Sequence, residues 1–466
     1  MNYFPTWGKA KEVKEQLLAS AQAQARPGED STLSRSPKTN AQFSVTSKTG
    51  ISTGRPSPRP SHTSSFKSSP RFSPKPQTPV KGKKLKGRLM KVIGIRRFAG
   101  SMAPLNSRPH VEYLPPGKED QLRETAKQLM KPGLGILAAD DSLRQIGDRL
   151  KTLQLDNTEA NRRRYHDMLL GGDIYMGDYF SGVLIREESL ASTRHLGDKL
   201  KEKSVIKDPN VSLGIRFDKT VERLVGTERE YFTPGLDKLQ DACQRMRESG
   251  AKFGLWRCVY RISECTPTRR ALTENSICLA RFAVICQQSG LVPIVAPEVL
   301  SEGTHGYTEA QEVWREILTT LVKTLLDYHV YLAGTLVRVT PVSPGQCYKG
   351  AKDLCRGAAS TMKILNECLP PALGGVLLAR DENLSKSISI LNSCQTCRIK
   401  KPFFVSFCFS LVIQEGVASM WAGLDKNLKK ARAELMKRAK LCSLASMGQY
   451  NPPRGSVFLI TREVIY

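Results

Sequence analysis

Acidic residues are missing from a long stretch in the first quarter of this chain. None occurs between Asp30 and Glu112, although lysine and arginine are spread throughout this stretch. Residues 1–108 contain 21 Lys and Arg against 4 Asp and Glu, a net charge of +17, while the remaining 358 residues carry only +10. The basic character of the chain is therefore mainly a property of its first segment, and it favours a polyanionic partner for that segment.

Cysteine is absent from the first half of the chain, and histidine is rare throughout. The twelve cysteines lie between Cys243 and Cys442, mostly within apolar runs, which is typical of reduced, buried thiols in a cytoplasmic protein. Cys394 and Cys397 form a single CxxC without a second pair or a nearby histidine, and the six histidines form no pair with ligand spacing. The sequence therefore predicts no metal site and no cofactor.

Long apolar runs are also lacking. No run reaches the roughly 18 residues that a membrane-spanning helix needs. The N-terminus has no hydrophobic region of a secretory signal, and Glu12 and Glu15 argue against a mitochondrial transit peptide. We therefore expect no membrane association and a cytoplasmic location.

The segment from Arg26 to Pro79 is rich in Ser, Thr, Pro, Lys and Arg. Such a composition buries too little apolar surface to offset the chain entropy lost on folding, so residues 1–108 are expected to form a disordered basic extension. A phosphate on its Ser-Pro and Thr-Pro sites would lower the positive charge of the extension. These sites begin at Ser36, Ser57, Ser69, Ser73 and Thr78.

From Gln121 onward, short apolar segments alternate with amphipathic ones, such as the helix predicted for 308–328. Eight apolar segments separated by helices favour parallel strands closed into a ring. The predicted fold is therefore an α/β fold, a (β/α)8 TIM barrel at residues 109–446, preceded by the extension and followed by a flexible tail at 447–466. The predicted strands are 135–140, 179–185, 212–217, 253–260, 291–296, 330–339, 374–378 and 403–409.

The segment from Gly133 to Ser142, GLGILAADDS, resembles the first barrel strand of class I fructose-bisphosphate aldolases. Further segments in the same order resemble later parts of that family, and Tyr466 lies where the family has a C-terminal tyrosine. Residues 1–108 have no recognisable counterpart in it. The matching segments are 157–163, 235–239, 256–259, 293–298 and 331–336.

The resemblance implies a lysine at the end of the sixth strand, whose amine attacks the ketose carbonyl and forms an imine. The matching residue here is Arg338. A guanidinium stays protonated, with a pKa above about 12, and does not form this imine. No other amine is predicted to take its place, because the strand at 330–339 places Leu332, Gly334 and Leu336 inward and Lys252 should point outward.

Other active-site positions implied by the resemblance are also changed. The acid/base glutamate of the fifth strand is replaced by Ala296, and the lysines of the fourth and third strands are replaced by Leu255 and Arg216. Retained family positions are Asp140, Glu298 and Tyr466 for catalysis, and Arg149 and Arg257 for substrate binding.

The phosphate-binding positions implied by the resemblance differ as well. The Ser-Gly-Gly turn after the seventh strand is replaced by Ala379-Arg380-Asp381, followed by Glu382, and the arginine after the eighth strand is replaced by Leu411. Loss of both glycines and gain of two carboxylates oppose phosphate binding. Arg338 and Arg380 would then either hold a different anion or serve as ion-pair partners.

These changes lead to the hypothesis of a pseudoenzyme that acts as a scaffold or a cytoskeleton-associated protein. Residues 31–97 would bind a polyanion such as a microtubule, actin or a nucleic acid, the last in a DNA minor groove. The alternative for these residues is a solvated tail without a fixed partner. The alternative is an active glycolytic aldolase that cleaves fructose 1,6-bisphosphate to dihydroxyacetone phosphate and glyceraldehyde 3-phosphate. The resemblance also implies a homotetramer.

Overall fold

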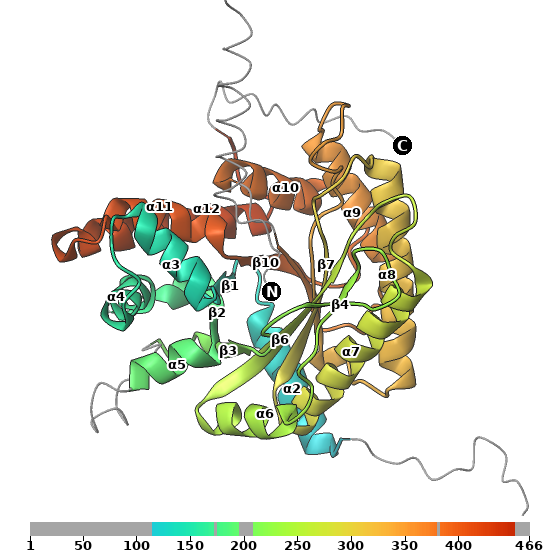
Figure 1. The fold of residues 1–466 in the computed structure, drawn as a ribbon, viewed down its shortest axis with the longest axis horizontal. Coiled ribbons are helices and arrows are strands. Elements are labelled where there is room, and N and C mark those ends of the chain that lie inside the picture. The colour runs from blue at the N-terminus through green and yellow to red at the C-terminus, as the bar shows by residue number, and fades with distance from the viewer. Residues whose placement is uncertain (1–113, 172–174, 195–207, 380–382, 453–466) are drawn as a thin grey trace, which may run out of the picture. The chain divides into compact units, whose positions relative to one another are not determined.

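A computed structural model describes residues 114–171, 175–194, 208–379 and 383–452 (Figure 1). The chain divides into units of residues 1–99 and 100–466, and the description concerns the second unit. The predicted extension at 1–108, Tyr466 and most of the predicted tail lie outside the described residues.

Eight parallel strands close into a barrel, which confirms the predicted fold class. Around the ring the order is β1-β10-β9-β8-β7-β6-β3-β2, and β1 closes the ring by pairing with β10, where Ile136 lies opposite Cys408. The strands are β1 (Gly135–Ala138), β2 (Phe180–Arg186), β3 (Ser212–Arg216), β6 (Ala251–Tyr260), β7 (Val292–Val299), β8 (Leu336–Val339), β9 (Gly375–Leu378) and β10 (Val405–Phe409).

Helices surround the ring of strands (Figure 1). They are α3 (Leu143–Thr152), α4 (Glu159–Leu170), α5 (Glu187–Arg194), α6 (Leu239–Glu248), α7 (Arg269–Gln288), α8 (Tyr307–Asp327), α9 (Leu354–Cys368), α10 (Leu384–Thr396), α11 (Leu411–Trp421) and α12 (Leu428–Ser446). The observed α8 agrees within one residue with the helix predicted from its apolar stripe. Side chains three or four positions apart on α8, among them Trp314, Ile317 and Leu321, are buried against the barrel.

One more helix, α2 (Pro116–Leu129), covers the end of the barrel where the strands begin. Its buried residues Leu122, Ala126 and Leu129 join the same apolar cluster as Phe253 and Val292, which point into the barrel. This end is therefore filled by apolar side chains. Charged side chains inside the ring gather at the opposite end, where the strands finish.

The predicted strand at 330–339 was wrong in its first half. Leu332–Gly334 form a 3-10 turn, and β8 begins only at Leu336, so Leu332 and Gly334 do not share its inward face. The cause is Gln287 at the end of α7. Its side-chain amide donates hydrogen bonds to the carbonyl of Tyr331 at 2.8 Å and to the hydroxyl of Thr335 at 2.9 Å, which holds the turn.

A two-stranded hairpin between β3 and α6 was not predicted. It pairs β4 (Glu222–Arg223) with β5 (Tyr231–Phe232) in antiparallel fashion. Strands of two residues have too little periodicity to be recognised in the sequence.

No helix within the described ranges is long and apolar enough to cross a membrane.

Candidate functional site

A layer of charged side chains lies inside the barrel at the carboxyl ends of its strands. The apolar interior includes Ala138, Leu184, Leu255, Ala296 and Leu336. Residues two positions further along each strand point to the same side, so the next inward side chains are charged. We call this set the charged layer: Asp140, Arg186, Arg216, Asp218, Arg257, Glu298 and Arg338.

Arg216 at the end of β3 lies between two carboxylates of the charged layer. Its Nη1 donates to Asp140 Oδ2 at 2.8 Å and its Nη2 to Asp218 Oδ2 at 2.7 Å. The Asp218 side chain is only 2% exposed, and it also accepts a hydrogen bond from the backbone N–H of Arg257 at 3.1 Å. Arg216 and Asp218 together thereby join three strands, β1, β3 and β6.

Arg186 at the end of β2 completes this half of the layer. Its Nε donates to the backbone carbonyl of Asp140 at 2.8 Å, and its Nη1 donates to that of Asp218 at 3.2 Å. Neither Arg186 nor Asp218 was predicted from the sequence. Arg186 lies two positions after the inward Leu184, and Asp218 lies two positions after Arg216. Because residues two apart on a strand share one face, this spacing could have indicated that both side chains point inward.

The other half of the layer centres on Glu298 of β7. Arg257 Nη1 lies 3.3 Å from Glu298 Oε1, and Arg338 Nη1 lies 3.4 Å from Glu298 Oε2. The side chain of Arg338 is 12% exposed, and that of Glu298 is 19% exposed. The residue at the imine-forming position is therefore held in an ion pair with a residue retained from the family pattern.

Both retained carboxylates are kept ionised by these arginines. Burial opposes ionisation of Asp140, but Arg216, Arg338 and Arg186 outweigh it and lower the pKa of the carboxyl below its ordinary value. Burial likewise opposes ionisation of Glu298, and Arg257, Arg338 and Arg216 lower its pKa. Neither carboxyl is therefore tuned to hold a proton near neutral pH, as a general acid must do.

Arg149 of α3 lies in a separate polar network outside the charged layer. Its Nη2 donates to Asp141 Oδ1 at 2.8 Å, and its Nη1 donates to the Tyr165 hydroxyl at 2.8 Å and to Gln414 Oε1 at 2.5 Å. Gln414 in turn donates to the backbone carbonyl of Ala138 at 2.6 Å. This network ties α3, α4 and α11 to the end of β1.

Two of the replaced positions are apolar and closed to solvent. Leu255 and Ala296 are buried at 1% and 0% exposure. Lys252 of β6 is exposed, as predicted, and lies away from the interior side chains of its strand. Ala379 is buried, whereas 380–382 and Tyr466 lie outside the described residues.

Within the described residues, no group of three or more His, Cys, Asp and Glu side chains is placed to hold a metal ion. The CxxC thiols make contacts within the fold. Cys394 is buried on α10, and the Cys397 thiol donates to the backbone carbonyl of Cys394 at 3.2 Å.

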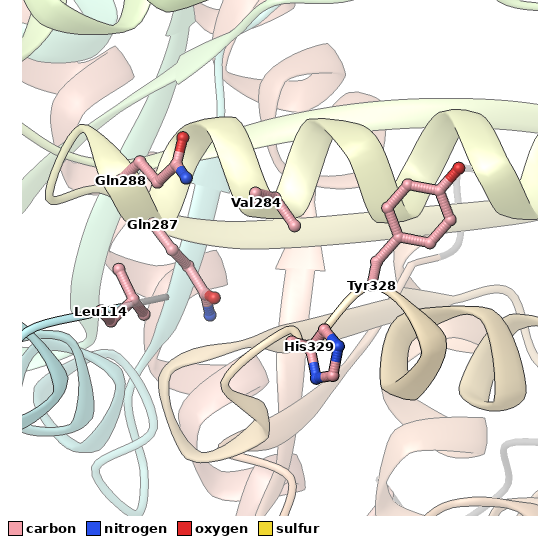
Figure 2. Close-up of a pocket in the computed structure, with 6 residues that line it drawn as sticks. All are labelled: Leu114, Val284, Gln287, Gln288, Tyr328 and His329. Atoms are coloured by element: carbon pink, nitrogen blue, oxygen red, sulfur yellow. The ribbon is translucent and has the colours of Figure 1, made fainter. Parts of the chain in front are cut away.

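Figure 2 shows a pocket on the outside of the barrel, at the end of α7 and the turn that follows α8. Its cavity volume is about 10 Å³, which is room for one water molecule. A second pocket between α8, α9 and the end of β8 is of the same size. None of the residues that line these two pockets belongs to the charged layer. They are Leu114, Val284, Gln287, Gln288, Tyr328 and His329 in the first, and Trp314, Leu318, Val339, Thr340, Val342, Thr361, Ile364 and Leu365 in the second.

The fold and the charged layer define a protein of the (β/α)8 barrel class whose polar centre lies at the carboxyl ends of the strands. The family model for class-I fructose-bisphosphate aldolase matches residues 121–459, so the chain belongs to this family.

Relatives of known name support the same assignment. The muscle-type fructose-bisphosphate aldolase of Lethenteron camtschaticum is 36% identical over 345 residues, which covers 74% of this chain and 94% of the relative. A fructose-bisphosphate aldolase of Schistosoma mansoni is 38% identical with the same coverage. The solved structure of the Plasmodium falciparum fructose-bisphosphate aldolase, in complex with TRAP and a small molecule inhibitor, matches with a TM-score of 0.69 at 33% identity. That match covers 73% of this chain and 97% of the other.

Proposed function

We propose that this member of the aldolase family is a pseudoenzyme, in which the barrel is a rigid scaffold and residues 31–97 bind a polyanionic partner. The observation that carries the proposal is Arg338 at the imine-forming position, where its guanidinium pairs with Glu298. A guanidinium has delocalised nitrogen lone pairs and stays protonated, so it does not add to a carbonyl as an amine does.

Two further observations support the loss of aldol cleavage. Ala296 cannot donate the proton that imine formation requires, and Leu255 leaves an apolar side chain where the family pattern has a second amine. The charged layer also neutralises itself to a large extent, with four arginines against three carboxylates. Cross-links among six strands stabilise the barrel and do not depend on a substrate.

For the basic segment we propose an acidic protein surface, such as a microtubule or an actin filament, as the partner. The support is the net charge of +17 in residues 1–108. We also propose a cytoplasmic, cytoskeleton-associated location and a homotetrameric assembly, both of which rest on the resemblance to the family.

The alternative, an active glycolytic aldolase, is favoured by family membership and by the retained Asp140 and Glu298. Borohydride trapping with dihydroxyacetone phosphate, followed by mass measurement of the whole chain, distinguishes the two functions. We expect no covalent adduct, whereas an active class I aldolase treated in parallel gains one. An adduct on any lysine of this chain would overturn the pseudoenzyme proposal.

A further inference from the structure

One face of α12 carries a row of lysines that extends from the turn before the helix almost to its end. The opposite face of the helix is buried through Ala431, Leu435, Ala439 and Cys442. Residues three, four and seven positions apart share one side of a helix. Lys430 and Lys437 are seven positions apart and Lys437 and Lys440 three, so these exposed side chains lie on the same side of α12. We call them the lysine row: Lys426, Lys429, Lys430, Lys437 and Lys440.

Carboxylates near the lysine row are used by other basic residues. Asp425 pairs with Arg164 at 2.8 Å, and Glu434 pairs with Arg438 at 2.8 Å. Lys437 lies 3.8 Å from the same Glu434, and its side chain is 72% exposed. In the part of the chain that the structure describes, the other four lysines of the row form no ion pair.

The row does not stabilise its own helix. Like charges at positions i and i+3 or i+4 of a helix, as in Lys437 with Lys440, cost the helix about 0.2–0.5 kcal/mol for each pair. The cost is offset when an anionic surface lies opposite, because the row then presents several positive charges along one line.

The residue types indicate which anion fits. Arginine is better suited than lysine to phosphates and nucleic acids, and aromatic side chains stack on bases. The row contains only lysines, while Arg432 and Arg438 of the same helix pair within the fold, with Asp167 at 3.7 Å and with Glu434. Point charges spaced along a helix match the carboxylates of an acidic protein surface.

We infer that the lysine row is a second docking surface, on the barrel itself, for a carboxylate-rich protein partner. This inference rests on the proposed scaffold function and deepens it, because the barrel then contributes to binding independently of residues 31–97. A partner that contacts both surfaces is held more tightly than by either surface alone.

The test uses the full chain and measures binding to poly-L-glutamate, to polymerised tubulin and to duplex DNA at two salt concentrations. The variant Lys429→Glu/Lys430→Glu/Lys440→Glu reverses three lysines of the row. Its matched control, Lys219→Glu/Lys252→Glu/Lys363→Glu, makes the same change in net charge at exposed lysines elsewhere on the barrel. Thermal unfolding of both variants checks the fold, and the milder triple glutamine variant at 429, 430 and 440 replaces the first if it fails to fold.

We expect the row variant to bind poly-L-glutamate and tubulin about tenfold more weakly, and the control to stay within about threefold of the unchanged chain. An equal loss in the control overturns the inference, because net charge alone would then explain it. A loss confined to DNA also overturns it in favour of a nucleic acid partner.

A third variant, Lys83→Gln/Lys84→Gln/Lys86→Gln, tests the N-terminal segment separately. If this variant binds normally while the row variant does not, the proposed role of residues 31–97 fails and the lysine row stands. The reverse result removes the lysine row and leaves the proposed function intact.

Discussion

At the scale of single residues, the chemistry of this barrel depends on whether a guanidinium or an amine lies at the end of β8. Arg338 is nearly buried and shares Glu298 with Arg257. A lysine at position 338 would lie near the positive charges of the other arginines in the charged layer. Such like charges lower the pKa of a lysine and favour its neutral form. Replacement of one side chain therefore tests how much of the activity depends on this residue alone.

We predict that Arg338→Lys by itself does not restore cleavage of fructose 1,6-bisphosphate. Without a glutamate at position 296, the missing proton donor costs about 10²–10⁴-fold in rate. A coupled assay for triose phosphates should place the variant at least about 100-fold below an active class I aldolase. The double variant Arg338→Lys/Ala296→Glu is expected to exceed the single one, and full activity of the single variant would contradict the prediction.

The charged layer should also determine stability, and in a graded way. Asp218→Asn removes a 2% exposed partner of Arg216 and should lower the free energy of unfolding by about 3–5 kcal/mol. Glu298→Gln should cost less, about 1–3 kcal/mol, because its contacts are longer and it is 19% exposed.

Urea denaturation of both variants measures these costs. The comparison is Glu124→Gln, which removes an exposed ion pair with Lys127 at 3.9 Å and should change stability by less than about 0.5 kcal/mol. Equal effects of all three substitutions would show that the layer is not a stabilising network.

At the scale of secondary structure elements, α4 contains a buried histidine whose protonation should couple stability to pH. Burial, together with Arg149 and Arg162, lowers the pKa of His166 from 6.5 to about 4. The unfolded chain therefore binds a proton between these two values while the folded chain does not. Stability from this group is complete above pH 6.5 and is lost as the pH falls towards 4.

We predict that the free energy of unfolding falls by on the order of 3 kcal/mol through His166 as the pH is lowered over this window. The measurement is urea denaturation between pH 7 and pH 4.5 for the unchanged chain and for His166→Gln. The variant should have a flatter pH dependence; parallel curves would assign the effect to other groups.

The elements also show what the sequence can and cannot predict. The eight strands were predictable because each is a short apolar run between helical segments. Arg338, Glu298 and Arg257 were selected by the resemblance to the aldolase family. The turn at Leu332–Gly334 was not predictable, since it depends on a hydrogen-bonding side chain, Gln287, that lies 44 residues away from Tyr331 in the sequence. Arg186 was not predicted because it is the last residue of its strand. In the sequence, a charged residue at that place is equally typical of an exposed strand end.

At the scale of the whole molecule, the uneven distribution of charge should make binding to acidic partners strongly dependent on salt. Counterions screen charges over about 10 Å at 0.1 M salt and displace a basic segment from a polyanion as their concentration rises. We predict that co-sedimentation with polymerised tubulin is lost between 50 and 200 mM salt, and that phosphorylation at Ser36, Ser57, Ser69, Ser73 and Thr78 weakens it further.

A chain treated with a proline-directed kinase, alongside a version with alanine at these five positions, tests the second part of this prediction. Kinase treatment should weaken binding only in the chain that keeps the five hydroxyls. Binding that persists unchanged at high salt would point to apolar contacts instead.

Assembly is a separate property of the whole molecule. Light scattering on the purified chain should give four times the chain mass of 51.8 kDa if the proposed homotetramer forms. A value equal to one chain would remove that proposal without affecting the scaffold function.

The ionic cross-links described above do not run all the way around the ring. They join β1, β2, β3, β6, β7 and β8. By contrast, β9 and β10 contain no charged residue and form a seam without ion pairs between the two strands. Protonation of the carboxylates at low pH therefore weakens the contacts among these six strands and leaves the contact between β9 and β10 unchanged. In a deuterium-labelling pulse at low pH, backbone amides of the six cross-linked strands should exchange before those of β9 and β10. The barrel would then open first on the side of the ion pairs.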